Sequence, residues 1–587
     1  MDSERVQPSL PRAVVVAVFV GAGLVYLAGL FVDLMDVDAA EYAHLAREMF
    51  EERGVLEVKN RGDDYLDKPP LVFWLAAASY ALLGVSTFAY KLPSLLFAVL
   101  GIYSTFRLTR LLAGERAGVL AALMLASCQA MFMMLIDPRT DTVLMGAVAF
   151  ALWKMAELER EPRLSSAVLG GVGVGLAMLA KGPIGLVVPV LAVLSDVALR
   201  RQWRRLWDPR WLLALAVAAA LLAPMVYGLY RQFGARGPAF FFWTQSFGRI
   251  TGSNPWRDAT TPLFFTHTIL WVWLPWSPLF LAGLWDRLAA LIRGRGRLAV
   301  EGEGFALGGF TLTFAALSLS QYKLPHYIYV ILPLAAVITS RYVVQRLGPP
   351  VAKPLRLLIG VQGVVALLVA AAGLAIAAWF FPLSSPLLAA VCAMLLVAAA
   401  VAYVRAPSEL FRLLVPSAAV MLAVNLMLSA HFYPALLRYQ SPTVAARIFT
   451  AHARPGERAF FYRVLAYSFD FYARRPVRDL KTPDEILEEA RRGPVWIYTD
   501  AQGAGELRRL PVVIDHESAL PHFHVSRLTF RFLNPATRSS AVEPRYLLRL
   551  RKREDSSALG PIRAVPPARP SQRELLDGRC PIARAAC

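Results

Sequence analysis

The apolar segment Ala13–Val32 (AVVVAVFVGAGLVYLAGLFV) and the polar segment Asp33–Met49 (DLMDVDAAEYAHLAREM) that follows it decide the fold class. An uninterrupted apolar run of about 20 residues is long enough to cross a bilayer as an α-helix. The segment after it changes at once to acids, bases and small residues. We therefore predict a membrane-spanning first helix that delivers a polar loop to one membrane surface.

Composition extends this prediction to most of the chain. Of the 587 residues, 57% are hydrophobic and only 18% are charged, whereas soluble domains have about 45–50% apolar and about 25% charged residues. These values exclude a soluble globular protein, and they exclude an intrinsically disordered chain, which needs low hydrophobicity. Apolar runs recur as far as about residue 437, so we predict a polytopic α-helical membrane protein.

We predict about 13 membrane-spanning helices within residues 1–437. The spans are expected at Ala13–Val32, Leu92–Leu112, Ala117–Ile136, Thr140–Leu158, Ala167–Ala180, Ile184–Leu199, Trp211–Tyr230, Leu263–Leu284, Phe305–Leu319, Tyr327–Val344, Leu357–Phe380, Leu383–Val404 and Leu413–His431. The apolar segment Pro70–Gly84 is too short to span the membrane. We interpret it as a juxtamembrane or re-entrant helix.

The net charge of +20 has two interpretations, a nucleic-acid-binding surface or loops that fix membrane topology. The arginines lie in short loops between apolar runs, for example in Arg200–Arg210 and Arg287–Arg297. With 13 spans and a cytoplasmic N-terminus, every basic cluster falls on the cytoplasmic side. A crossing at Pro70–Gly84 would turn these clusters outward. We therefore predict no nucleic-acid partner.

The same parity places a first outer loop at residues 33–69 and a second large outer loop at residues 231–262. It also places three polar span junctions on the outer face: Asp137–Asp141, Lys181–Pro183 and Gln321–His326. Charged residues at membrane depth are expensive and are therefore candidates for function. We expect the functional site on this face.

Two stretches of the first outer loop carry candidate side chains. Asp38, Glu41 and Tyr42 share one helix face by their spacing, although Asp38 could equally cap a solvated amphipathic helix. Asp67-Lys68 directly precedes two prolines that stop a helix. Lys68 could neutralise a phosphate, or it could simply extend its ammonium group to the membrane interface.

The junction Asp137-Pro138-Arg139-Thr140-Asp141 joins two expected spans. Its two carboxylates could hold a divalent cation or orient an acceptor hydroxyl. Alternatively, Asp141 interacts only with the first turn of the helix that follows.

Lys181-Gly182-Pro183 interrupts another apolar stretch. The glycines of Gly170–Gly175 before it fit close helix packing better than a nucleotide-binding loop, because they follow no strand and lack the Gly-Lys-Ser/Thr ending. The last junction carries Tyr322, Lys323, His326 and Tyr327. Interfacial tyrosines are common, but a lysine and a histidine beside them are less expected.

These segments together collect carboxylates and three lysines, Lys68, Lys181 and Lys323, on the outer face. The lysines could bind the phosphate of a lipid. A carboxylate could act as the base when a group is transferred from that lipid to a hydroxyl.

In order and spacing these motifs resemble the GT-C-fold glycosyltransferases that use polyprenyl-phosphate sugars, above all the lipid A aminoarabinose transferases, which are related to the protein O-mannosyltransferases. The resemblance covers most of residues 13–435. It rests on Asp38-x-x-Glu-Tyr-Ala-x-x-Ala-Arg-Glu-Met, Tyr65-x-x-Lys68-Pro-Pro, Arg139-Thr-Asp141, Ala180-Lys-Gly-Pro183 and Ser320-x-x-Lys323-Leu-Pro-His-Tyr327.

The resemblance implies an inverting glycosyltransferase of the bacterial inner membrane with a periplasmic site. It would move a sugar from a polyprenyl-phosphate carrier to lipid A, another glycolipid or a protein. By position, the catalytic residues would be Asp38, supported by Asp141, Asp137 and Glu41. The donor phosphate would be bound by Lys68, Lys181, Lys323, Tyr322, Tyr327 and His326. Further substrate contacts would come from Tyr42, Arg139 and Asp67.

Some departures from the aminoarabinose transferases leave the sugar and the metal open. That branch usually has Arg at the position of Glu41 and Glu at the position of Asp67. It usually also has a metal-ligating His in the loop where this chain has Asn254–Pro262. A divalent metal ion is the only cofactor that the resemblance implies.

Residues 438–550 have the pattern of a small α/β domain on the outer face. Ala459–Val464 and Val495–Tyr498 read as buried strands, Pro483–Arg492 reads as a helix with a favourable charge order, and Arg527–Phe532 alternates like a strand. The tail, residues 551–587, is rich in Pro, Arg and Ala and is expected to be disordered. Three histidines fit a solvated loop better than a metal site: His516, His522 and His524.

Two other function classes fit an equally apolar body. A transporter or lipid flippase often carries inverted repeats and charges near the bilayer midplane, whereas this chain shows no internal repeat and its charges lie at the outer face. A surface-polysaccharide ligase would lack the motifs quoted above. The predicted function is therefore glycosyl transfer.

Overall fold

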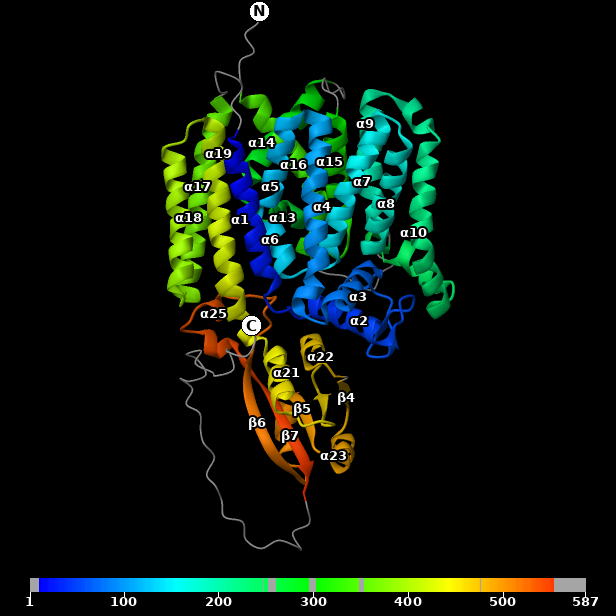
Figure 1. The fold of residues 1–587 in the computed structure, drawn as a ribbon, viewed down its shortest axis with the longest axis vertical. Coiled ribbons are helices and arrows are strands. Elements are labelled where there is room, and N and C mark those ends of the chain that lie inside the picture. The colour runs from blue at the N-terminus through cyan, green and yellow to red at the C-terminus, as the bar shows by residue number, and fades with distance from the viewer. Residues whose placement is uncertain are drawn as a thin grey trace, which may run out of the picture.

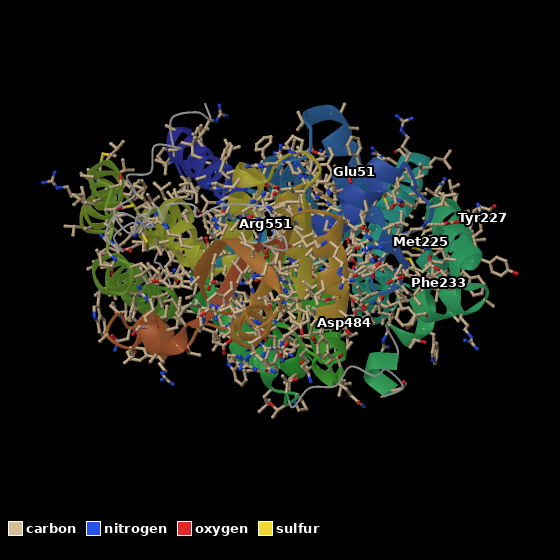
Figure 2. All side chains as sticks on the ribbon, turned by 90° about the horizontal axis from the view of Figure 1, so that it is seen from below. Glu51, Met225, Tyr227, Phe233, Asp484 and Arg551 are labelled. Atoms are coloured by element: carbon tan, nitrogen blue, oxygen red, sulfur yellow. The ribbon has the colours of Figure 1, made fainter. Side chains whose placement is uncertain are left out.

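The computed structural model describes residues 10–245, 248–251, 260–294, 302–347, 353–475 and 477–553. Figure 1 shows a bundle of long helices and, below one end of it, a smaller part with a β-sheet. We call this smaller part, from Ser441 onward, the C-terminal part. Viewed from below, with the C-terminal part in front, this part covers the middle of the bundle, while Tyr227 and Phe233 of α10 lie at the edge (Figure 2).

The helices of the bundle differ in length, from 8 residues in α6 to 27 in α4. They are α1 (Arg12–Leu30), α4 (Thr87–Ala113), α5 (Glu115–Ala126), α6 (Gln129–Ile136), α7 (Thr140–Arg160), α8 (Leu164–Lys181), α9 (Ile184–Arg200), α10 (Arg210–Phe233), α13 (Phe264–Val272), α14 (Ser277–Arg293), α15 (Glu303–Leu319), α16 (Leu332–Arg346), α17 (Lys353–Ala375), α18 (Pro386–Val404) and α19 (Glu409–Met427).

Further elements connect or extend these helices. They are α2 (Asp38–Glu52), β1 (Lys59–Asn60), β2 (Asp63–Asp64), α3 (Leu71–Leu83), η1 (Trp203–Trp207), α11 (Arg236–Ala239), η2 (Phe240–Thr244), α12 (Gly248–Thr251), η3 (Pro325–Ile331), η4 (Ile376–Phe380), η5 (Leu428–Phe432), α20 (Tyr433–Leu436) and η6 (Leu437–Tyr439).

The predicted multi-pass membrane protein is confirmed. In the described part of the chain, eight helices are long and apolar enough to cross a membrane, and nine if the bent pair α5–α6 counts as one. The number of about 13 spans stays a prediction. One expected span, Leu263–Leu284, is instead divided into α13 and α14, because Pro275 in the turn between them has no N–H for a helical hydrogen bond.

Helix α3 is the short apolar segment expected beside the membrane. It has 13 residues, too few to span a bilayer, and it lies next to α2 at the end of the bundle (Figure 1). Tyr80 Oη donates a hydrogen bond to Ala43 O over 3.3 Å, and the rings of Phe73 and Tyr42 lie 5.8 Å apart. Gly84, with φ of 77°, ends the helix in a conformation that favours glycine.

The glycines of α8 pack closely against neighbouring helices, as predicted. A Cβ atom on Gly171 would lie 2.4 Å from Ala214 O on α10, and one on Gly173 would lie 2.9 Å from the backbone of Ala151 on α7. Any larger side chain at these positions would push the helices apart.

The C-terminal part contains a five-stranded sheet with the order β4-β3-β5-β7-β6. Strand β3 is parallel to β4 and β5, and β7 is antiparallel to β5 and β6. Its elements are α21 (Ser441–His452), β3 (Arg458–Tyr462), α22 (Tyr467–Ala473), β4 (Arg478–Leu480), α23 (Pro483–Arg492), β5 (Val495–Asp500), α24 (Ala501–Leu507), β6 (Val512–His522), α25 (Phe530–Leu533), η7 (Arg538–Ala541) and β7 (Glu543–Lys552). The predicted α/β character is confirmed.

The predicted strand at Arg527–Phe532 is wrong. Thr529 caps the short helix α25, because its side chain accepts a hydrogen bond from Phe532 N over 3.3 Å. The buried ring of Phe532 stacks on Phe523 with a centroid distance of 3.7 Å. The alternation of polar and apolar residues in Arg527–Phe532 therefore comes from one buried ring, that of Phe532, in a short helix. The neighbouring strands of the sheet are β6 and β7.

Two of the histidines that we expected in a loop also lie elsewhere. His516 and His522 are both in β6, and His522 Nδ1 lies 2.9 Å from Ser441 Oγ. Residues 554–587 of the predicted disordered tail lie outside the described residues.

Candidate functional site

The candidate site is a cavity of about 330 Å³ at the end of the bundle that carries α2 and α3. Nine of the predicted site residues line it: Asp38, Tyr42, Asp67, Lys68, Asp141, Lys181, Tyr322, His326 and Tyr327. Apolar side chains continue the lining: Leu144, Ile184, Val187, Ala316, Leu317 and Leu324. A polar cluster and an apolar wall therefore meet in one cavity.

Helix ends place the charged groups in this cavity. Asp38 begins α2 and Asp141 lies in the first turn of α7, where a helix dipole favours negative charge. Lys181 lies in the last turn of α8, where the helix dipole favours positive charge. The chain breaks that make these termini, Pro138 before α7 and Gly182-Pro183 after α8, are therefore what gathers the site.

Arg139 joins two carboxylates from different elements. Its Nη1 donates to Asp38 Oδ2 over 2.5 Å, and its Nε and Nη2 donate to Asp137 Oδ2 over 3.0 and 2.9 Å. His326 Nδ1 lies 3.4 Å from the same Nη1. Arg139 and Asp137 are outside the cavity lining, so Asp38 is held by an ion pair whose other members do not line the cavity.

A second charge pair faces the cavity directly. Lys181 Nζ donates to Asp141 Oδ1 over 2.5 Å and lies 3.8 Å from the centre of the Tyr327 ring. His326 Nε2 is 3.7 Å from Asp141 Oδ2. A lysine held over an aromatic face beside a carboxylate has its position fixed before any anionic ligand arrives.

The third pair, Lys68 with Asp67, lines the part of the cavity that the first outer loop forms. Gln245 Nε2 donates to Asp67 Oδ1 over 3.2 Å and to Asp67 O. Sequence reasoning missed Gln245, because an isolated glutamine in a long loop carries no motif.

Glu41 lies behind these groups and outside the cavity lining. Burial raises the pKa of Glu41 to about 7; Lys68 lowers this pKa, while Asp38 and Asp67 raise it further. Its folded pKa thus exceeds its usual value of 4.5. The group therefore stabilises the fold below about pH 4.5, and this stabilisation is lost as the pH rises through about 7.

We expect the melting temperature of the wild-type protein in detergent to fall between about pH 5 and about pH 8. The fall should be smaller in Glu41→Gln, because glutamine cannot ionise. Burial also raises the pKa of Asp36, to about 6, so part of the fall should remain. The exposed Glu52 on the same helix gives the control Glu52→Gln, which should melt like the wild type. An unchanged pH dependence in Glu41→Gln would contradict the assignment.

Lys323 is not part of the cavity lining. It is buried, and its Nζ donates to Thr260 O and Oγ1 over 3.3 and 3.4 Å. Its predicted role in phosphate binding stays a prediction. The structure therefore brings two of the three predicted lysines, Lys68 and Lys181, to the cavity.

Lys91 is a residue that sequence reasoning missed. It is fully buried in α4 and donates to Gly29 O, Val32 O and Ile136 O over 3.1, 2.7 and 2.6 Å. Gly29 and Ile136 lie in the last turns of α1 and α6, and Val32 lies two residues after α1. Lys91 thereby ties together the ends of the two helices that lead into Asp38 and Asp137.

Gln440, just before the C-terminal part, and Ser468 within it hold the segment just before Asp38. Asp36 N donates to Gln440 Oε1 over 2.8 Å, and Gln440 Nε2 donates to Leu34 O over 2.8 Å. Ser468 donates to the Asp36 carboxylate from its N over 2.9 Å and from its Oγ over 2.6 Å. No sequence pattern could have revealed these contacts, because their partners are about 400 residues apart.

The predicted divalent ion stays a prediction. Among the residues that the structure describes, no group of three or more His, Cys, Asp or Glu side chains could hold a metal ion. Asp137 and Asp141 each pair with a different cation, Arg139 and Lys181. Most of the stretch Asn254–Pro262 lies outside the described residues.

Comparison with known proteins agrees with this fold. Residues 67–227 match the family "Dolichyl-phosphate-mannose-protein mannosyltransferase". The chain is 29% identical over 353 residues to an undecaprenyl phosphate-alpha-4-amino-4-deoxy-L-arabinose arabinosyl transferase of Edwardsiella ictaluri, covering 58% of this chain and 60% of that protein. It is 30% identical over 385 residues to a like-named protein of Pseudomonas fluorescens, covering 61% and 62%.

A solved structure extends the similarity to nearly the whole fold. The crystal structure of ArnT from Cupriavidus metallidurans bound to undecaprenyl phosphate covers 93% of this chain and 99% of that one, with a TM-score of 0.70 and 20% identity. In sequence, the chain spans about three fifths of the length of the relatives it matches. The resemblance in the motifs is thus confirmed: the chain has the GT-C fold and is similar to the aminoarabinose transferases and the protein mannosyltransferase-like family.

Proposed function

We propose that the protein is a glycosyltransferase that moves a sugar from a polyprenyl-phosphate carrier to a hydroxyl acceptor. The observation that carries the proposal is the cavity in which Asp38 and Asp141 face Lys68 and Lys181 beside an apolar wall. The carrier has the same division, a phosphate head on an apolar chain. The names of the similar proteins, which specify undecaprenyl phosphate linked to 4-amino-4-deoxy-L-arabinose, support this substrate class.

In the proposed reaction the acceptor oxygen attacks the anomeric carbon while the bond from that carbon to the phosphate oxygen breaks. Asp38 accepts the proton of the acceptor hydroxyl. Lys68 and Lys181 stabilise the negative charge that develops on the polyprenyl phosphate as it leaves. Attack from the side opposite the phosphate inverts the anomeric configuration. Arg139 keeps Asp38 in place.

Replacing Lys181 by methionine is expected to weaken the binding of undecaprenyl phosphate by about 10-fold to 150-fold. A charge-assisted hydrogen bond contributes about 1.5–3 kcal/mol, and about 1.4 kcal/mol corresponds to a factor of ten in Kd. Binding can be measured on the purified protein in detergent by microscale thermophoresis.

Lys154 supplies the matched control for this experiment. It lies on α7 outside the cavity, with its Nζ 2.9 Å from Glu157 Oε2. Lys154→Met should bind undecaprenyl phosphate like the wild type. Equal affinities in the Lys181 and Lys154 variants would contradict the assignment of Lys181 as a phosphate ligand.

We further propose that the site and the C-terminal part face the periplasm. Arginine-rich loops favour the cytoplasmic side, and Arg200–Arg210 lies at the end of the bundle opposite the C-terminal part (Figure 1). In a cysteine-free background, a cysteine at Asp484 should react with a membrane-impermeant maleimide in cells with permeabilised outer membranes. A cysteine at Arg204 should react only after lysis. Labelling of both before lysis would contradict the topology.

The acceptor is proposed to be lipid A, with another glycolipid or a protein hydroxyl as alternatives. Glu41 and Asp67, where the chain departs from the aminoarabinose transferases, both interact with Lys68. The identity of the transferred sugar is therefore a question for experiment. Mass spectrometry of lipid A and surface glycans from a deletion strain would identify the missing modification.

A further inference from the structure

The segment Ser526–Arg531 protrudes from the C-terminal part beside the ends of α17 and α18 (Figure 1). All six of its residues are exposed, including Leu528 at 43% and Phe530 at 64%. We propose that this segment inserts into the interface of the adjacent lipid leaflet and anchors the C-terminal part to the membrane. We call it the interfacial segment.

The interfacial segment continues a surface of the membrane-spanning bundle. The Phe530 ring lies 6.4 Å from the Trp379 ring and 6.1 Å from the Phe380 ring. Trp379 and Phe380 belong to η4, which extends α17, and they stack at 4.9 Å. Trp379 is itself 52% exposed. Aromatic side chains from two distant parts of the chain thus form one exposed patch at the end of the bundle.

Arg538 holds the interfacial segment at this place. Its Nη2 donates to Phe380 O at the end of η4 and to Leu533 O over 2.9 Å, and its Nε donates to Phe532 O over 3.0 Å. Its guanidinium group lies 4.1 Å from the centre of the Phe381 ring. Phe530 is therefore exposed on a segment that Arg538 ties to the bundle, and its exposure does not come from an unanchored loop.

The neighbouring surface indicates that lipid covers this patch. On α17 and α18, Leu374 is 56% exposed and Leu387 is 76% exposed, as expected for helices that face hydrocarbon. Aromatic residues concentrate at the membrane–water interface, and apolar side chains flanked by basic ones bind at the headgroup boundary. Arg527 and Arg531 provide that basic flank for anionic headgroups.

Site-directed spin labelling of the full-length protein in phosphatidylethanolamine–phosphatidylglycerol vesicles tests the proposal. A nitroxide is attached at position 528 or 530, in separate variants of a cysteine-free background. The control label is at Asp484 in α23, at the far end of the sheet (Figure 1). Collision rates are measured with oxygen, which enters the bilayer, and with a nickel chelate, which remains in water.

The expected result is a several-fold higher ratio of oxygen to nickel collisions at 528 and 530 than at 484. Equal ratios at the three positions would place the interfacial segment in water and overturn the proposal. Low collision rates with both reagents at 528 and 530 would indicate protein contact, for example with a second copy of the chain, and would also overturn it. Neither result depends on the proposed transferase activity.

Discussion

Replacing Asp38 by asparagine is expected to abolish sugar transfer while leaving the protein folded. Loss of a general base lowers a reaction rate by about 10²–10⁴-fold. The asparagine oxygen can still accept the hydrogen bond that Arg139 Nη1 donates to Asp38 Oδ2, so the melting temperature should change little. The measurement is the rate of transfer to acceptor by purified protein in lipid vesicles, with a melting curve on the same sample.

The matched control is Glu52→Gln, at the exposed end of the same helix. It removes one carboxylate from α2 without touching the cavity and should transfer at the wild-type rate. Wild-type transfer by Asp38→Asn would show that this carboxylate is not the base. A large fall in the melting temperature would instead assign Asp38 to structure.

Replacing Arg139 has the second largest expected effect, and this effect divides between stability and rate. Arg139→Met leaves Asp38 and Asp137 without their shared cation. Removing one partner of a buried ion pair costs about 3–5 kcal/mol. We expect the low end, about 3 kcal/mol, because the two carboxylates are 32% and 19% exposed.

The conservative variant separates the two effects. Arg139→Lys keeps the charge, but one ammonium group cannot reproduce three donors in a fixed plane. We expect a smaller loss of stability than in Arg139→Met, together with a fall in transfer rate of about 10²-fold from a displaced Asp38. Arg163, an exposed arginine at the start of α8, supplies the control Arg163→Lys. Full transfer by Arg139→Lys would contradict the positioning role.

Much of the bundle could be predicted from the sequence, because lipid imposes strict rules on length and polarity. The expected spans at Thr140–Leu158 and Ile184–Leu199 differ from α7 and α9 by at most two residues at either end. The 47° bend between α5 and α6 was not predicted, since uniform hydrophobicity does not reveal where a helix breaks.

The candidate site was predictable where its residues lie at chain breaks. Asp141 follows Pro138 and Lys181 precedes Gly182-Pro183, so their position at helix ends could be read directly. The side chains that support these residues could not be predicted from the sequence. Lys91 falls just before an expected span, and its three carbonyl partners come from α1, the residues just after it, and the end of α6.

The C-terminal part was predicted less well. Its buried strands β3 and β5 are apolar runs and were recognised. Strand β6 at the edge of the sheet and its neighbour β7 both mix polar and apolar side chains and were not recognised. Strands of this kind are defined by their partner and not by their own pattern. The roles of Gln440 and Ser468, which bind the Asp36 backbone and the Asp36 carboxylate, likewise depend on tertiary contacts alone.

The central claim is that this cavity breaks the bond between a sugar and polyprenyl phosphate. The most direct measurement uses wild-type protein in vesicles with undecaprenyl-phosphate-linked aminoarabinose, labelled in the sugar, and lipid A. We predict that label appears in lipid A with release of one undecaprenyl phosphate per transfer, and that Asp38→Asn releases none. Intact donor that is moved to the opposite leaflet, equally by wild type and Asp38→Asn, would contradict the claim and would identify a flippase.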